Sequence, residues 1–388
     1  MKVVLSTIGV FHFFNLARQL HQRDYLTRIF SGYPRWKLKD EALPRNLIST
    51  FPWLVTIRMG LPRFGLLPPW LARPLNNTAH VLHDAHVAAN MPDCDIFHGL
   101  SRYNLAADRA AKARGARYIC DVGSSHILTQ ESLLRDEFER MGVAFDGIDP
   151  RAIERELQEY DEAESITVPS AFNVRSFIEN GLPAAKIKQV PYGVDVSRFH
   201  PVEVEDDGVF RVGFVGNLSV RKGIHYLAKA FAMADIPNSE LVLIGMPTPE
   251  ADRLLEPVRG MRVVRTGHVP QPQLAQWMSR FHVKVLPSIE EGLALVLLQT
   301  QACGCPVIAT VNSGGPDCIE DGVNGYLTPI RDPQAIAEKL VFLAENRDVQ
   351  RRMGKAALDH ARGAATWDGY GKLMVAHYSD LLGLTSAA

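Results

Sequence analysis

The sequence lacks paired cysteines and long apolar runs, and these two absences exclude several classes of protein. The 388 residues contain no Cys-x-x-Cys spacing of the kind that binds zinc; the five cysteines are Cys94, Cys120, Cys303, Cys305 and Cys318. An odd number of cysteines indicates reduced thiols, so we expect a cytoplasmic protein. No stretch reaches the roughly 18 uninterrupted apolar residues that a membrane-spanning helix needs.

Net charge and the first residues exclude two further classes. The formal charge at pH 7 is −1, so no overall field attracts nucleic acid, and we expect no nucleic-acid partner. Residues 1–9 form a short, strand-like run rather than the longer apolar core of a secretory signal, so we expect no signal peptide.

Length and composition favour a globular enzyme with two domains. The chain is too long for one ordinary core, and 46% of its residues are hydrophobic and 22% charged. Short runs of strand-forming residues alternate with longer helical patterns, which predicts two doubly wound parallel sheets. The predicted strands are 2–8, 26–31, 95–99, 117–121, 165–169 and 188–192 in the first half, and 211–216, 240–245, 262–267, 283–287, 307–310 and 325–328 in the second.

The boundary between the two halves is predicted at an acidic stretch, 200–208, which has no periodicity and no apolar face. We therefore expect a first domain over residues 1–202 and a second over 209–365. Residues 366–388 contain a last amphipathic helix, from Trp367 to about Leu382.

The most informative motif lies in the second half. Residues 291–308 read E-G-L-A-L-V-L-L-Q-T-Q-A-C-G-C-P-V-I, which joins an acidic glycine turn, the start of an apolar helix and a strand. Such a junction at the carboxyl end of a strand is where α/β folds bind small molecules. Glu291 and Gln299 are eight residues apart, a little over two helical turns, so a ligand along the helix start can touch both.

This stretch resembles the signature of the retaining nucleotide-sugar glycosyltransferases of family four, E-G-F-G-L-x-x-x-E-A-x-A-x-G-x-P-V-I, and the resemblance extends more loosely over nearly the whole chain. It implies the GT-B fold, an α/β architecture in which two Rossmann-like domains face a central cleft and a C-terminal helix crosses back to the first domain. The first domain then binds the acceptor, and the second binds the nucleotide sugar, which is a co-substrate rather than a cofactor.

A second motif, the loop 215–223 with the sequence V-G-N-L-S-V-R-K-G, brings two cations to the end of a predicted strand. It matches neither the phosphate-binding loop of nucleoside triphosphatases nor Gly-x-Gly-x-x-Gly. It is similar to the family loop V-G-R-x-x-x-x-K-G, whose Arg and Lys hold the diphosphate. Lys222 falls on the family Lys and Asn217 on the family Arg, and we expect Arg221 to substitute for that Arg. The alternative is that both cations belong to an exposed helix turn.

The resemblance implies roles for the other donor-site residues. Glu291 accepts hydrogen bonds from the donor sugar, and Gln299 replaces a family Glu that binds the ribose hydroxyls. A glutamine amide can still accept from one hydroxyl and donate to another, although it loses charge-assisted strength. The remaining donor-site residues are Gly9 and Gly216, which let the backbone approach the diphosphate, the amides of Ala294, Leu295 and Val296 at a helix start, and Val269 at the nucleobase.

Two histidines are candidates for the region between donor and acceptor. His126 ends the stretch D-V-G-S-S-H, where the family often has a histidine that faces the donor sugar; the alternative is a histidine held by neighbouring loop groups. His12, among aromatic residues after the first strand, is a candidate for lining the acceptor pocket, although such aromatics more often pack a helix onto a sheet. For His98 we favour a structural role.

Two segments suggest ligands of other kinds. His80, His83 and His86 do not converge on one face of a helix, so we expect no metal site. The apolar stretch 51–73 is interrupted by prolines and arginines and cannot span a bilayer. It either lies at a membrane interface, which suits a lipid-linked acceptor, or forms a hairpin or dimer contact that covers the core.

The sequence therefore predicts a metal-independent retaining glycosyltransferase that moves a sugar from a nucleotide diphosphate to a hydroxyl of a sugar or lipid-linked acceptor, in cell-surface polysaccharide or glycolipid assembly. The predicted catalytic residues are Glu291, Lys222, Arg221 and His126. The expected route has no protein nucleophile, and a leaving phosphate oxygen takes the acceptor's proton. Two alternatives stay open: a nucleotide-sugar epimerase of the same architecture, and a catalytically silent nucleotide-sugar-binding subunit, which the departures from the family motifs favour.

Overall fold

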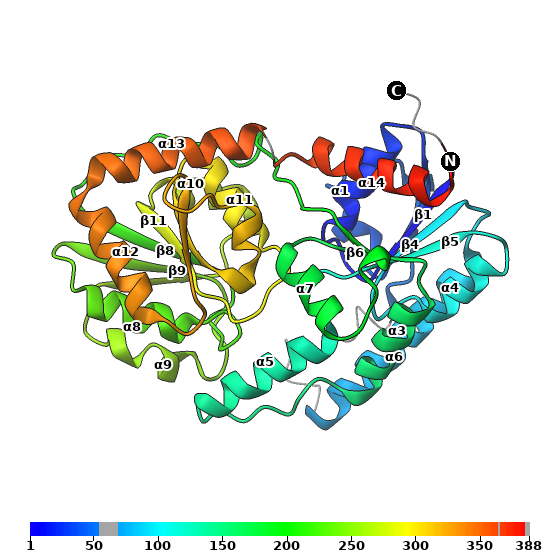
Figure 1. Cartoon of the computed structure of the whole chain (residues 1–388), viewed down its shortest axis with the longest axis horizontal. Helices are drawn as coiled ribbons and strands as arrows, with labels where there is room; N and C mark the ends of the chain where they lie inside the picture. Colours follow the sequence, from blue (N-terminus) through cyan, green and yellow to red (C-terminus); the bar gives the residue numbers. More distant parts are fainter. Residues whose placement is uncertain (54–68, 364, 385–388) are drawn as a thin grey trace.

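Two parallel sheets, side by side in Figure 1, form the framework of the protein. The computed structural model describes residues 1–53, 69–363 and 365–384. Within these residues the first sheet has the strand order β3-β2-β1-β4-β5-β6-β7 and the second the order β10-β9-β8-β11-β12-β13. We call each sheet with its covering helices the first lobe and the second lobe.

The strands agree closely with the hydrophobic pattern of the sequence. Those of the first sheet are β1 Val3–Thr7, β2 Leu26–Ser31, β3 Ile48–Thr50, β4 Ile96–Leu100, β5 Arg117–Asp121, β6 Ser165–Val168 and β7 Ile187–Gln189; those of the second are β8 Phe210–Val215, β9 Ser239–Ile244, β10 Val263–Gly267, β11 Val283–Leu286, β12 Val307–Thr310 and β13 Gly325–Thr328. The interior strands are buried on both faces because helices cover each sheet, which explains their continuous apolar runs. The prediction missed only β3, a short edge strand in which Ile48 alone is buried.

Helices connect most of the successive parallel strands, as a crossover between parallel strands requires. In the first lobe they are α1 Phe13–His21, α3 Pro69–Asn90, α4 Leu105–Lys112, α5 Ile127–Arg140, α6 Pro150–Glu162 and α7 Ala171–Glu179; in the second they are α8 Ile224–Ala234, α9 Ala251–Leu254, α10 Gln271–Ser279, α11 Leu295–Ala302, α12 Pro333–Glu345 and α13 Arg347–Gly363. Short 3₁₀ turns occur at Arg35–Leu38, Arg45–Leu47, Ala184–Lys186, Glu256–Val258, Val311–Ser313 and Gly315–Asp317.

The chain crosses between the lobes twice, and the two crossings run side by side. After β7 the chain passes to the second lobe, and it returns after α13 as helix α14, Trp367–Leu381 (Figure 1). At the crossing the backbone N–H of Val194 donates to the carbonyl of Ala365 at 2.8 Å. The predicted last helix and its return to the first lobe are thus confirmed.

Helix α14 is fastened to the first lobe by buried polar contacts as well as by packing. The hydroxyl of Tyr378 hydrogen-bonds to Nδ1 of His98 on β4 at 2.6 Å, and Nε2 of His377 pairs with the hydroxyl of Ser165 on β6 at 2.9 Å. The last helix therefore reaches the interior of the first sheet, and His98 has the structural role that the sequence favoured.

Most of the stretch 51–73 lies outside the described residues. Among the helices that the structure describes, none combines the length and the apolar character needed to cross a bilayer.

Candidate functional site

A cavity of about 540 Å³ lies between the lobes, at the carboxyl ends of strands from both sheets. The chain leaves every parallel strand at this edge, so loops from both lobes converge there. The first lobe contributes Phe11, His12, Leu100, Ser101, Arg102, Tyr103, Gly123, Ser124, Gln130, Glu156 and Tyr192, and the second contributes Arg221, Lys222, Glu291, Leu293, Ala294, Leu295, Val296 and Gln299. We call it the cleft cavity.

Lys222 and Glu291 face each other on the wall of the second lobe. Between β8 and α8, Gly223 adopts a φ of +65°, and a Cβ there would lie 1.9 Å from the carbonyl oxygen of Pro287, so only glycine lets the loop pack this closely against the end of β11. This packing places Nζ of Lys222 in an ion pair with Oε1 of Glu291. Burial would raise the pKa of Glu291, but the charges of Lys222 and Arg221 bring it below its ordinary value, so the carboxyl is ionised.

The start of α11 supplies groups of another kind to the same wall. Leu295 and Val296 are the first two residues of the helix, and their N–H groups have no acceptor within it. One turn later the side chain of Gln299 lines the cavity and makes no hydrogen bond to any residue that the structure describes. A helix N-terminus beside a lysine suits an anion, and a free amide suits hydroxyls.

Arg221 lines the cavity, but its charge is already balanced. Its Nη2 lies 2.9 Å from Oε2 of Glu290, and its Nε donates to the same carboxylate oxygen at 3.0 Å. Burial would lower the pKa of Arg221, but the charges of Glu290 and Glu291 keep it above its ordinary value. The Arg221 side chain is 38% exposed, whereas that of Glu290 is fully buried. Glu290 was not predicted as a site residue, because the motif shared with the family begins at Glu291.

His126 lies elsewhere, which corrects the expectation that it faces the donor sugar. The residue lines a separate cavity that shares no lining residue with the cleft cavity. It caps the N-terminus of α5, where its Nδ1 accepts from the N–H of Leu128 at 3.3 Å, and its ring packs against Tyr160 and Phe177. Burial lowers the pKa of His126 to about 4. The capping geometry turns the ring away from the cleft, as the alternative interpretation of this residue anticipated.

Four further predicted residues do not line the cleft cavity. Gly216 and Asn217 directly follow β8, and the side chain of Asn217 is exposed to solvent. Val269 follows β10 at the edge of the second sheet. Gly9 lies next to the ring of Phe11, which would be 2.8 Å from a Cβ at Gly9. Phe11, and not Gly9, lines the cavity.

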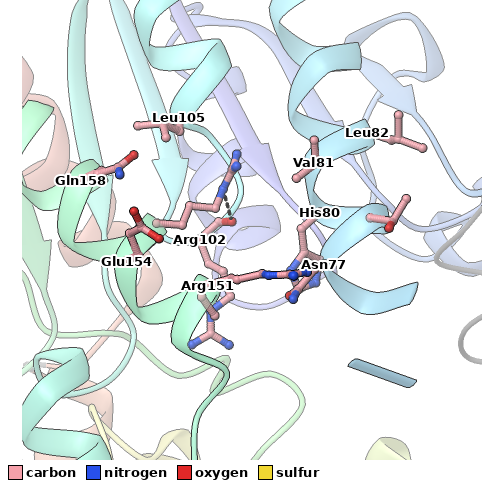
Figure 2. Close-up of a pocket in the computed structure, with 12 residues that line it drawn as sticks. Asn77, His80, Val81, Leu82, Arg102, Leu105, Arg151, Glu154 and Gln158 are labelled. Atoms are coloured by element: carbon pink, nitrogen blue, oxygen red, sulfur yellow. Dashed lines mark hydrogen bonds between the residues drawn. The ribbon is translucent and has the colours of Figure 1, made fainter. Parts of the chain in front are cut away.

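A second cavity, of about 520 Å³, adjoins the cleft cavity in the first lobe, and Arg102 lines both. Figure 2 shows Asn77, His80, Val81 and Leu82 on one side, from α3, and Arg151, Glu154 and Gln158 on the other, from α6. Arg102 is held in place because its Nη2 pairs with Oε1 of Glu156 at 2.5 Å.

The three histidines of α3 have separate environments. His80 packs edge-on against Tyr103, and His86 stacks on Phe51. Burial lowers the pKa of His83 to about 3. Among the described residues no group of three or more His, Cys, Asp or Glu side chains is arranged to hold a metal ion.

The comparison with curated proteins finds relatives over part of the chain. D-inositol 3-phosphate glycosyltransferase from Kribbella flavida is 32% identical over 206 residues, which are 47% of this chain and 48% of that protein. The protein of the same name from Streptomyces scabiei is also 32% identical over 206 residues, 47% of this chain and 46% of its own. The chain therefore matches about half the length of these relatives.

Solved structures match over nearly the whole chain and share its fold. Sucrose-phosphate synthase from Thermosynechococcus elongatus superposes with a TM-score of 0.72 at 20% identity, covering 99% of this chain and 100% of that one. The HepE protein of Anabaena in complex with UDP and glucose superposes with a TM-score of 0.73 at 18% identity, covering 98% and 100%. The two facing lobes and the returning helix are thus the GT-B fold.

Two family models match consecutive parts of the sequence. The model described as "Glycosyltransferase Family 4" matches residues 9–198, and the model described as "Glycosyl transferases group 1" matches residues 209–346. The first match lies in the first lobe, and the second contains the loop of Lys222 and the helix of Gln299. The chain belongs to the group 1 and family 4 glycosyltransferases.

Proposed function

We propose that the chain transfers a sugar from a nucleotide diphosphate to a hydroxyl acceptor in the cleft cavity. The observation that carries this proposal is the convergence of Lys222, Glu291, Gln299 and the start of α11 on one cavity between the lobes. These groups lie on the second lobe, so we place the donor there. Structures that share the fold hold UDP with glucose, or UDP-glucose, which supports a donor of this class.

The proposed chemistry depends on the charge that develops as the diphosphate leaves. Lys222 and the first amides of α11 are preorganised donors for that charge, and removing one such donor typically costs 10²–10³-fold in rate. Glu291 orients the sugar through its hydroxyls, and Gln299 binds the ribose. Because cations of the protein balance the charge, the proposal includes no metal ion and no cofactor.

The acceptor belongs on the wall of the first lobe. Ser101, Tyr103, Ser124 and Gln130 line it with hydroxyl and amide groups, which suits a hydroxylated acceptor such as a free or lipid-linked sugar. As the family resemblance implies, we propose that the anomeric configuration is retained and that the product belongs to a cell-surface polysaccharide or glycolipid.

A panel of nucleotide sugars tests the proposal. The protein is incubated with each donor, and the products are separated and analysed. Slow release of nucleoside diphosphate with free sugar supports the transferase, because water replaces the absent acceptor. An interconverted donor supports the epimerase instead. Binding without turnover supports a silent subunit, for which the amide of Gln299 in place of a carboxylate is the motivating observation.

A further inference from the structure

The second cavity, between α3 and α6, has no role in the transfer of a sugar to a hydroxyl that reacts in the cleft cavity. It has a volume of about 520 Å³, and Arg102 lines both cavities. Resting on the proposed function, we propose that the second cavity binds the sugar unit next to the one that reacts, so that the acceptor is a neutral oligosaccharide rather than a single sugar.

The sizes of the two cavities favour an acceptor that extends beyond the cleft. The cleft cavity, of about 540 Å³, must hold the nucleotide-diphosphate sugar together with the acceptor hydroxyl that reacts. That donor alone is a ligand of the size for which pockets of about 300–1,000 Å³ are usual. Little of the cleft cavity therefore remains for the rest of the acceptor, and the second cavity is an adjoining space in the lobe that we assign to it.

The junction between the two cavities is built from side chains that are held in place. Nη2 of Arg102 lies 2.5 Å from Oε1 of buried Glu156, which lines the cleft cavity, and the carbonyl of Arg102 accepts from Nε of Arg155 at 3.0 Å. Beside them Tyr103, in the wall of the cleft cavity, packs edge-on against His80, in the wall of the second cavity, with ring centroids 4.5 Å apart. An acceptor that extends from one cavity into the other therefore meets groups that are already positioned.

Helix α6 supplies polar side chains to the second cavity at helical spacing. Arg151 and Arg155 are one turn apart. Glu154 and Gln158 repeat this spacing on the next row of the helix, and both line the cavity together with Arg151 (Figure 2). The side chains of Arg151, Glu154 and Gln158 make no hydrogen bond or ion pair with any residue that the structure describes. A cation, an anion and an amide are thus available to hydroxyl groups, which both donate and accept.

The charges around the second cavity balance, which favours a neutral ligand over an anion. Arg102 is already paired, and Arg155 pairs with the buried carboxylate of Asp84 on α3. The other arginine and carboxylate side chains in the wall, Arg151 and Glu154, have opposite signs. An anion bound here would meet a carboxylate as well as a cation, so the loss of its hydration would be poorly compensated. A sugar has no net charge and needs donors and acceptors together, which this wall provides.

A third cavity continues the row along α6. It has a volume of about 390 Å³ and shares Glu154 and Gln158 with the second cavity. His126 lines it, and Nε2 of this histidine is buried without a hydrogen-bond partner among the described residues. The cavities therefore follow one another from the cleft along one helix, as the binding of a chain of sugar units requires.

The test compares acceptors of different length and charge with the fastest donor of the nucleotide-sugar panel. The acceptors are glucose, galactose, mannose and N-acetylglucosamine, the neutral disaccharides and trisaccharides that carry each of them at an end, and the phosphates and octyl glycosides of the same four sugars. A second sugar unit adds several hydrogen bonds, so we expect kcat/KM for at least one disaccharide to exceed that for its monosaccharide by about tenfold or more. A phosphate or an octyl chain should bring a smaller gain than the second sugar.

Two variants show whether the gain comes from the second cavity. Val81→Trp places an indole in the cavity from a position on α3 that is 49% exposed, so the ratio of kcat/KM for the disaccharide to that for the monosaccharide should fall to about one. Arg151→Ala removes one donor and should lower this ratio by about threefold to tenfold. Val323→Trp, at a position of the second lobe that is 45% exposed, is the matched control and should keep the wild-type ratio. Loss of folded protein lowers both rates alike and leaves the ratio unchanged.

The proposal is overturned if no oligosaccharide in the panel is a better acceptor than its monosaccharide, or if Val81→Trp keeps the wild-type ratio. A larger gain from a phosphate would show that the acceptor is anionic, and a larger gain from an octyl chain would show that a lipid occupies the second cavity; either result also overturns it. The proposed function fails separately, if the wild-type protein releases nucleoside diphosphate from no donor in the panel.

Discussion

Glu290 of the second lobe accepts two hydrogen bonds from Ser125 of the first, one from the backbone N–H at 2.9 Å and one from the hydroxyl at 2.8 Å. Its other oxygen accepts from Gln130 of the first lobe at 3.0 Å and from Arg221 of its own lobe. One buried carboxylate therefore joins the two lobes and holds a cation in the cleft. The contact between the lobes and the position of Arg221 therefore depend on the same carboxylate.

Glu290→Gln should weaken the contact between the two lobes. Donors approach both carboxylate oxygens, so the amide nitrogen of the glutamine must face a donor, and an unpaired buried group of this kind costs on the order of 1–3 kcal/mol. We expect a lower Tm, a larger radius of gyration in small-angle X-ray scattering and a reduced transfer rate. The exposed Glu345, changed in the same way, is the control. An unaltered scattering curve in Glu290→Gln would show that the carboxylate does not hold the lobes together.

Lys222→Ala should lower the rate of donor cleavage by at least about 10²-fold, because the leaving diphosphate loses a preorganised cation. The variant also leaves Glu291 without its partner, so the affinity for UDP should fall together with the rate. The comparison is Lys355→Ala, which removes an exposed lysine on α13. Turnover in Lys222→Ala equal to that of the control would remove this lysine from the mechanism.

Gln299→Glu should strengthen the binding of the ribose hydroxyls of UDP. Hydrogen bonds to a charged acceptor are roughly twice as strong as neutral ones, so we expect the Kd of UDP to fall by about threefold to tenfold. Titration with 2′,3′-dideoxy UDP supplies the control, since it lacks both ribose hydroxyls and should bind the two proteins alike. Equal gains for both nucleotides would mean that residue 299 acts on another part of the ligand.

Lys284→Met should stabilise the protein in a pH-dependent way. Lys284 is fully buried on β11, and its Nζ has no hydrogen-bond partner among the described residues. Burial, and secondly the charge of Lys222, lower its pKa to about 7. The folded state therefore binds fewer protons than the unfolded state between about pH 7 and the ordinary lysine pKa of about 10.4, so wild-type stability rises with pH across that window.

The variant Lys284→Met has no titrating group at this position, so its stability lacks this rise with pH. A shift of one pKa unit corresponds to about 1.4 kcal/mol, so the free energy of unfolding of Lys284→Met should exceed that of the wild type by up to about 4 kcal/mol near pH 6. This difference should shrink towards pH 10. Denaturant unfolding at pH 6, 8 and 10 measures it, with Lys188→Met on the edge strand β7 as the control. If the difference in free energy of unfolding between variant and wild type stayed constant with pH, Lys284 would have the same charge in the folded and the unfolded state.

The strands and the motif of Glu291 were predictable because their signals are local. An apolar run between glycine turns indicates a buried strand, whatever its position in the sheet. The strand β3 was missed because its three residues contain no such run. Lys222, Glu291 and Gln299 come from loops that follow strands, and parallel strands deliver their carboxyl ends to one edge. The fold and most of the second-lobe residues that line the cleft cavity could therefore be predicted from the sequence.

The misplaced and missed residues depend on contacts between distant segments. The family resemblance implies a histidine here that faces the donor sugar, but His126 caps α5 and lines a separate cavity. Glu290 and Glu291 are neighbours with opposite surroundings, since one side chain meets the first lobe and the other meets Lys222. The motif marks Glu291, but no local pattern shows that Glu290 meets the first lobe or that His126 faces away from the cleft.

The sequence by itself determined two alternating α/β halves and a sugar-nucleotide motif at their strand ends, because periodicity and glycine turns act over a few residues. Only the tertiary structure decided which side chains share the cleft, and it brought His12 to Asp121 across 109 residues of chain. That meeting depends on the order in which β1, β4 and β5 lie in the sheet, which is a property of the packed lobe and not of any segment within it.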